Sequence, residues 1–152
     1  DVMVPVEWIE EKRSREKTRL TLQRARAALE AERAMVIFPS GRLARKRRGL
    51  VADEPWAPSA LALARKYDAP LVPAHLKGPH NTLFHLFDRF SKELRDITLF
   101  HELLNKERDR FALTIGPAIA PERLEGDASV LTERLKRYIE RDLVRDPDRP
   151  FA

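Results

Sequence analysis

The chain has 152 residues, no cysteine and a formal net charge of +5 at pH 7. This length predicts one domain with a real core. The absence of cysteine excludes disulfides, catalytic thiolates and metal–thiolate sites. No stretch approaches the ~18 apolar residues that a membrane span needs, and the basic balance favours anionic partners: nucleic acid, anionic lipid or phosphorylated metabolites.

The N-terminal part predicts a strand, a helix and a second strand. Residues 2–6 are a short β-rich run that looks like a strand entered partway. Residues 9–33 predict a helix, because apolar residues recur at helical spacing along it. Residues 34–38 are a continuous apolar run, which is typical of a strand buried on both faces in a parallel sheet.

A long loop over residues 39–58 comes next, followed by a helix over residues 59–67 that turns Leu61 and Ala64 inward. After a turn, residues 71–76 predict another buried strand. A strand, a helix and a strand of these lengths form a βαβ unit, whose crossover should be right-handed.

The C-terminal part predicts a helix over residues 97–105, a strand over residues 111–115 and a last helix. Asp127 can cap that last helix, which runs to about Leu143. One face of it carries the apolar residues Leu131, Leu135, Tyr138 and Ile139. Residues 77–96 are weakly periodic and include an apolar patch at 83–90, for which a core role is favoured over contact with an acyl chain or a membrane.

The fold class predicted from these elements is α/β, a mostly parallel sheet flanked by helices and incomplete at its N-terminal side. Residues 1–145 should form the domain, and the polar, proline-rich residues 146–152 should be a frayed tail. We expect six apolar residues to be buried in neighbouring strands. They are Val36, Ile37, Leu71, Val72, Leu113 and Ile115.

The most informative stretch is Phe38-Pro39-Ser40-Gly41-Arg42, at the end of a predicted strand. Five cations lie within residues 42–48. A glycine turn lets backbone N–H groups approach an anion closely, and arginine side chains match phosphate oxygens two at a time. We therefore expect Phe38, Pro39, Ser40, Gly41, Arg42 and Arg45 to bind a phosphorylated or acidic ligand.

Other chemistries lack their motifs. No Gly-Lys-Ser/Thr follows the glycines, no G-x-G-x-x-G occurs, and Ser40-Gly41 lacks the glycine of a serine-hydrolase elbow. The histidines have neither His-x-x-x-His nor His-Glu-x-x-His spacing, so no metal site is predicted. Trp56 is interpreted as a packing anchor rather than a ligand platform, and Asp53 as either a loop cap or a partner of a nearby arginine.

The ordered set of motifs resembles the PlsC-like glycerophospholipid acyltransferases, especially their hemolysin-like and ornithine-lipid branch. The resemblance covers residues 2–125. It rests on Val36-Ile37-Phe38-Pro39-Ser40-Gly41, Trp56, Leu63-Ala64-Arg65, Ala69-Pro70-Leu71-Val72-Pro73-Ala74-His75 and Thr114-Ile115-Gly116-Pro117-Ala118-Ile119.

The resemblance implies acyl transfer from a thioester donor, an acyl carrier protein or coenzyme A, to a lysophospholipid, glycerol phosphate or related polar lipid precursor. No further cofactor is implied. The family's catalytic His-x-x-x-x-Asp is absent here, because no histidine has an aspartate five residues later. Ser40 and Arg42 also stand where relatives have Glu. Either the chain is the C-terminal part of a longer enzyme, which is favoured, or it is a diverged, non-catalytic relative.

On this reading the chain binds the acceptor and carries no catalytic residue. Gly41 would offer backbone N–H groups, Arg42 and Arg45 would bind the anionic head, and residues 46–48 would attract anionic lipid. The expected location is cytoplasmic, peripheral at the inner membrane face. The alternative is a non-catalytic module that binds RNA or an anionic membrane through residues 42–48. Nucleic acid is the less favoured partner, because no aromatic residue lies among these cations.

Overall fold

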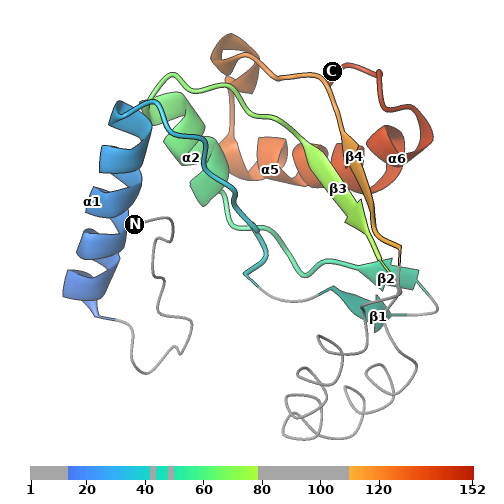
Figure 1. Cartoon of the computed structure of the whole chain (residues 1–152), viewed down its shortest axis with the longest axis horizontal. Helices are drawn as coiled ribbons and strands as arrows, with labels where there is room; N and C mark the ends of the chain where they lie inside the picture. Colours follow the sequence, from blue (N-terminus) through green and yellow to red (C-terminus); the bar gives the residue numbers. More distant parts are fainter. Residues whose placement is uncertain (1–13, 42–43, 48–49, 79–109) are drawn as a thin grey trace, which may run out of the picture.

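The computed structural model describes residues 14–41, 44–47, 50–78 and 110–152. The predicted strand over residues 2–6, the helix over 97–105 and the apolar patch at 83–90 lie outside the described residues. Figure 1 shows the arrangement of the elements. In chain order they are α1 (Arg15–Glu30), β1 (Arg45–Arg47), β2 (Leu50–Ala52), α2 (Ser59–Lys66), β3 (Ala74–Lys77), β4 (Ala112–Ile115), the 3-10 helix η2 (Pro121–Leu124), α5 (Ala128–Arg137), the π-helical turn η3 (Tyr138–Asp142) and α6 (Leu143–Arg145).

Helix α1 begins and ends at well-formed caps. The Ser14 side chain accepts a hydrogen bond from the backbone N–H of Lys17, which satisfies a free donor of the first turn. The helix ends at Glu30 with Ala31 as its C-cap, and the next residue, Glu32, has a φ of 55° in the left-handed region. Ala25 is its one buried residue, so α1 packs little of its surface. In Figure 1 it lies apart from the strands, beside α2.

The hydrophobic core lies among α2, η2, α5, η3 and α6. Asp127 caps α5 as predicted, and its carboxylate accepts a hydrogen bond of 2.9 Å from the backbone N–H of Val130. Leu61 and Ala64 of α2 face inward as predicted, and so does the expected apolar face of α5 and η3. The core consists of Leu61, Ala64, Ile119, Leu124, Leu131, Leu135, Tyr138, Ile139, Leu143 and Phe151.

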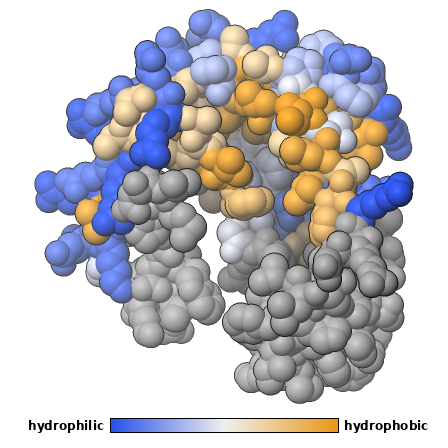
Figure 2. Space-filling view, viewed as in Figure 1, coloured by the Kyte–Doolittle hydropathy of each residue, from blue (hydrophilic) through white to orange (hydrophobic). Residues whose placement is uncertain are grey.

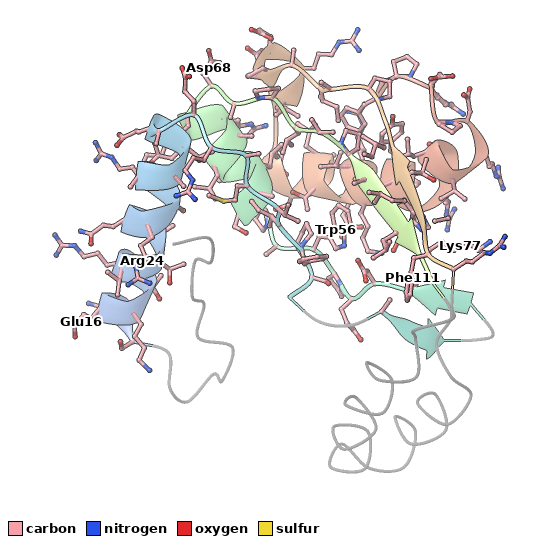
Figure 3. All side chains as sticks on the ribbon, viewed as in Figure 1. Glu16, Arg24, Trp56, Asp68, Lys77 and Phe111 are labelled. Atoms are coloured by element: carbon pink, nitrogen blue, oxygen red, sulfur yellow. The ribbon has the colours of Figure 1, made fainter. Side chains whose placement is uncertain are left out.

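Strands β3 and β4 form an antiparallel pair, with Ala74 opposite Ile115 and Lys77 opposite Ala112. Figure 3 shows Lys77 and Phe111 at one end of this pair. The inner face packs closely on the core, because a Cβ added at Gly116 would lie 2.5 Å from Leu143 and 3.1 Å from Pro73.

The outer face of the pair is apolar, but it is exposed. Val72, Leu76, Leu113 and Ile115 all show more than half of their surface, and the prediction that Val72, Leu113 and Ile115 are buried is therefore wrong. Leu71 is half-buried and makes a single bridge to Ile119. Within the described part of the chain, a layer packs on only one of the two faces of this pair.

Residues 34–38 are extended without strand pairing among the described residues. Val36 is 82% exposed and Phe38 is 75% exposed, so the expected burial of this run is not observed, although Ile37 is half-buried. The paired strands of the described residues are all antiparallel. The mostly parallel α/β sheet stays a prediction.

The loop predicted over residues 39–58 contains an antiparallel hairpin. β1 pairs with β2 in the register Arg45 opposite Ala52 and Arg47 opposite Leu50. Two residues, Arg48 and Gly49, connect the strands, and a two-residue connection with glycine is a common hairpin signal. The hairpin was not predicted from the sequence, because a run of cations such as Arg45–Arg47 does not have the composition typical of a strand.

The C-terminal tail differs from the frayed segment that its composition predicts. Phe151 is 5% exposed and belongs to the core. The Arg123 guanidinium donates a hydrogen bond of 3.2 Å to the backbone oxygen of Phe151. The buried Phe151 side chain and this hydrogen bond hold the tail against the helices.

Candidate functional site

The candidate site is the turn at Phe38–Gly41. The backbone N–H of Gly41 donates a hydrogen bond of 3.0 Å to the Phe38 carbonyl oxygen, which closes the turn. Gly41 has a φ of 60°, in the left-handed region that glycine adopts without strain. A Cβ added there would meet no atom of the described residues within 4 Å, so these residues leave the space beside the Gly41 backbone open.

The structure brings four of the six predicted site residues together in this turn. Phe38 and Gly41 are exposed, while Pro39 and Ser40 are half-buried. Arg45 begins strand β1, where its backbone is opposite Ala52. Arg42 lies outside the described residues. A convergence of both arginines on one anion therefore stays a prediction.

The segment between β2 and α2 supports the turn from behind. The backbone N–H of Ala57 donates a hydrogen bond of 3.0 Å to the Pro39 carbonyl oxygen. Figure 1 shows the two segments crossing near the middle of the molecule. This contact fixes the turn to residues that are themselves anchored in the core.

Trp56 supplies that anchor. Its ring is half-buried and packs against the hydrophobic core, which confirms the interpretation of Trp56 as a packing anchor. The indole N–H donates a hydrogen bond of 3.0 Å to Oδ2 of Asp53. Asp53 thus holds the tryptophan of its own loop.

Glu140 is a site-supporting residue that the sequence did not single out. Its Oε1 accepts a hydrogen bond of 3.2 Å from the backbone N–H of Asp53, 87 residues away in the chain. Lys136 pairs with both oxygens of this carboxylate, at 2.8 and 2.9 Å. The spacing of Lys136 and Glu140 was visible as a helical ion pair, but no local pattern indicates the contact with Asp53.

His75 lies on the inner face of β3, half-buried and opposite Thr114.

Within the described ranges, no group of three or more histidine or acidic residues could hold a metal ion. In the same part of the chain, no helix combines the length and hydropathy of a membrane span. Figure 2 shows hydrophobic residues gathered over the middle of the described part and hydrophilic residues along its rim.

Comparison with known families gives the class of protein. The model of the family described as Acyltransferase matches residues 1–77, just over half of the chain, and the chain belongs to this family. The match ends at Lys77, so it includes the Phe38–Gly41 turn, the loop that holds it and strand β3. The general chemistry of the family is acyl transfer. No curated protein and no solved structure matches the chain.

Proposed function

We propose that this chain binds the acceptor in a PlsC-like acyltransferase of the hemolysin-like or ornithine-lipid branch. The reaction is transfer of an acyl group from a thioester of acyl carrier protein or coenzyme A to a lysophospholipid, glycerol phosphate or related polar lipid precursor. The acceptor oxygen forms the new ester bond, the thioester C–S bond breaks, and the carrier leaves as its thiol.

The observation that carries this proposal is the open, left-handed turn at Gly41 within the region matched by the family. A backbone without a side chain lets an anion approach the turn closely, and the following sequence supplies Arg42 and Arg45. These cations favour a phosphorylated head group as the ligand.

The apolar residues beside the turn favour an acceptor that also has a hydrocarbon part. Val36 is 82% exposed and Phe38 is 75% exposed, directly before the polar end of the turn. Burial of apolar surface stabilises a complex by roughly 25 cal/mol per Å². A lysophospholipid could therefore contact Phe38 with its acyl chain and the arginines with its phosphate.

Proton transfer requires a base that the chain does not supply. In the family pattern a histidine takes the proton of the acceptor hydroxyl and an aspartate orients the imidazole. No His-x-x-x-x-Asp occurs in these 152 residues. We infer that the residues present bind and orient the acceptor, and that the protein works peripherally at the cytoplasmic face of the inner membrane.

We also propose the α/β class for the complete domain, with helices on both faces of the sheet. The support is the composition of β3 and β4, because Leu76, Leu113 and Ile115 make their outer face as apolar as a buried one. An exposed apolar strand face needs a covering layer, and sheets that combine parallel strands with an antiparallel edge strand are common in this class.

The test is a binding titration of the purified chain with glycerol phosphate and with a short-chain lysophosphatidic acid. The Arg42→Ala and Arg45→Ala variants should each weaken both ligands by about tenfold or more, since hydrogen bonds to charged groups contribute ~1.5–3 kcal/mol. The matched control is Arg24→Ala, on the exposed face of α1 (Figure 3).

Two results would contradict the proposal. One is equal loss of affinity in Arg24→Ala, which would indicate a diffuse basic surface. The other is tight, salt-sensitive binding of single-stranded RNA with no binding of either lipid precursor, which would favour the alternative module.

A further inference from the structure

A continuous series of contacts joins Glu140 to the Phe38–Gly41 turn. The Glu140 carboxylate accepts a hydrogen bond of 3.2 Å from the Asp53 backbone N–H. The Asp53 carboxylate accepts one of 3.0 Å from the Trp56 indole N–H. The next residue, Ala57, donates to the Pro39 carbonyl oxygen at 3.0 Å. Segments from three distant parts of the sequence therefore meet at this loop.

Glu140 itself is held in a single orientation. Lys136 binds both carboxylate oxygens, and the side chains of Lys136 and Glu140 are only 14% and 27% exposed. A partly buried ion pair is screened by salt much less than one in open solvent. The carboxylate therefore presents a fixed acceptor to the Asp53 N–H.

Glu140 lies in the π-helical turn η3, in which the backbone N–H of Leu143 donates a hydrogen bond to the Tyr138 carbonyl oxygen, five residues earlier. Tyr138, Ile139 and Leu143 are buried in this segment, while Glu140 pairs with Lys136. Single π-helical turns are frequent at functional sites.

We propose that Glu140 is a positioning residue for the anion site at Gly41, acting through Asp53, Trp56 and Pro39. This inference rests on the proposed function, that the Gly41 turn binds the anionic head of the acceptor. Loss of the Glu140 carboxylate frees the Asp53–Ala57 loop, and the Phe38–Gly41 turn then loses the contact that fixes its orientation.

The experiment uses the full chain with Trp8→Phe, which leaves Trp56 as the one tryptophan and its fluorescence as a probe of the loop. Four variants are compared: Glu140→Ala, Glu140→Gln, Glu133→Ala and Ile119→Val. Glu140→Gln keeps an oxygen that can accept from Asp53. Glu133→Ala removes an exposed acid from the same helical segment, and Ile119→Val lowers core stability without removing any hydrogen bond of the Glu140–Asp53–Trp56 series.

Glu140→Ala should shift the Trp56 emission to longer wavelength, increase its quenching by acrylamide and weaken glycerol phosphate binding about tenfold, the equivalent of about 1.4 kcal/mol. Glu140→Gln should restore most of the affinity. Glu133→Ala and Ile119→Val should leave the Trp56 emission wavelength unchanged. Their affinity for glycerol phosphate should stay within about twofold of the parent.

The inference is overturned if Glu140→Ala leaves Trp56 unchanged, or if Ile119→Val weakens binding as much, which would indicate general stability alone. Failure of the proposed function is a separate result: the parent chain would not bind glycerol phosphate, whereas the Trp56 signal would still report whether Glu140 positions the loop.

Discussion

Tyr138 Oη donates a hydrogen bond of 2.6 Å to the backbone carbonyl oxygen of Arg149. This bond satisfies the hydroxyl of a tyrosine that is only 4% exposed. The Tyr138 ring also lies edge-on to Phe151, with centroids 5.4 Å apart and planes at 67°. An ion pair of 3.6 Å between Arg149 and Asp142 adds to the contact. The π-helical turn and the last residues of the chain therefore stabilise one another.

The first prediction concerns the tail. Phe151→Ala should lower the free energy of unfolding by about 3–5 kcal/mol, because a large side chain is removed from a packed core. Chemical denaturation measures the effect, and Val144→Ala is the control, since Val144 is 43% exposed on α6. A loss below about 0.5 kcal/mol, no larger than that of an ordinary surface change, would mean that the tail is frayed after all.

The second prediction concerns pH. Burial, and to a smaller extent the Asp142 carboxylate, raise the pKa of Tyr138 above its ordinary value of 10.0. The folded state therefore favours the neutral phenol. This contribution to stability is fully present below the unfolded pKa of about 10 and is lost as the pH rises through the higher folded-state pKa.

Tyr138→Phe should accordingly lower the free energy of unfolding by about 1 kcal/mol at pH 8, where the lost hydrogen bond is the main effect. The difference between the two proteins should shrink above a pH of about 10, because only the parent has this phenol to titrate. Denaturation curves of the parent and Tyr138→Phe at several pH values measure this difference in the free energy of unfolding. A difference that stays constant or grows in alkali would contradict the assignment.

The local features of the fold were predictable from the sequence, because each depends on nearby residues. The Asp127 cap, the inward face of α2 and the apolar face of α5 all follow from spacing and capping chemistry. The exposure of Val72 and Leu113 could not be predicted in this way. An apolar strand face shows which environment its residues prefer, but it does not show whether a second layer covers them.

The same difference applies to the candidate site. The glycine turn at Gly41 was indicated by the local sequence, since glycine after proline and serine is a turn signal. The support from Glu140 was not indicated by the sequence. Its hydrogen bond to Asp53 joins residues 87 positions apart, and it uses a backbone N–H that every residue except proline offers.

The third prediction concerns close packing behind β4. A Cβ at position 116 would lie 2.5 Å from Leu143 Cδ1, closer than two carbon atoms allow, and 3.2 Å from Tyr138 Oη, which is a tight contact. Gly116→Ala should therefore destabilise the chain by about 1–3 kcal/mol through overpacking. Thermal unfolding measures the effect. Combining Gly116→Ala with Leu143→Ala should lose less than the sum of the two single changes, and strict additivity would show that the clash is absent.

The last prediction separates backbone conformation from space at the candidate site. Gly41 has room for a side chain, since nothing lies within 4 Å of an added Cβ, but its φ of 60° is left-handed. Gly41→Ala should therefore cost about 1–2 kcal/mol of stability by strain alone. Gly41→Asn should cost less, because asparagine adopts this conformation more readily than alanine.

Binding should follow a different order from stability. If the anion lies against the open backbone at Gly41, any side chain limits its approach. Both variants should therefore weaken glycerol phosphate binding, even where Gly41→Asn is nearly as stable as the parent. Paired unfolding and titration measurements on the two variants decide this. Full affinity in Gly41→Asn would show that glycine is needed only for the turn, and that the anion lies elsewhere on the basic loop.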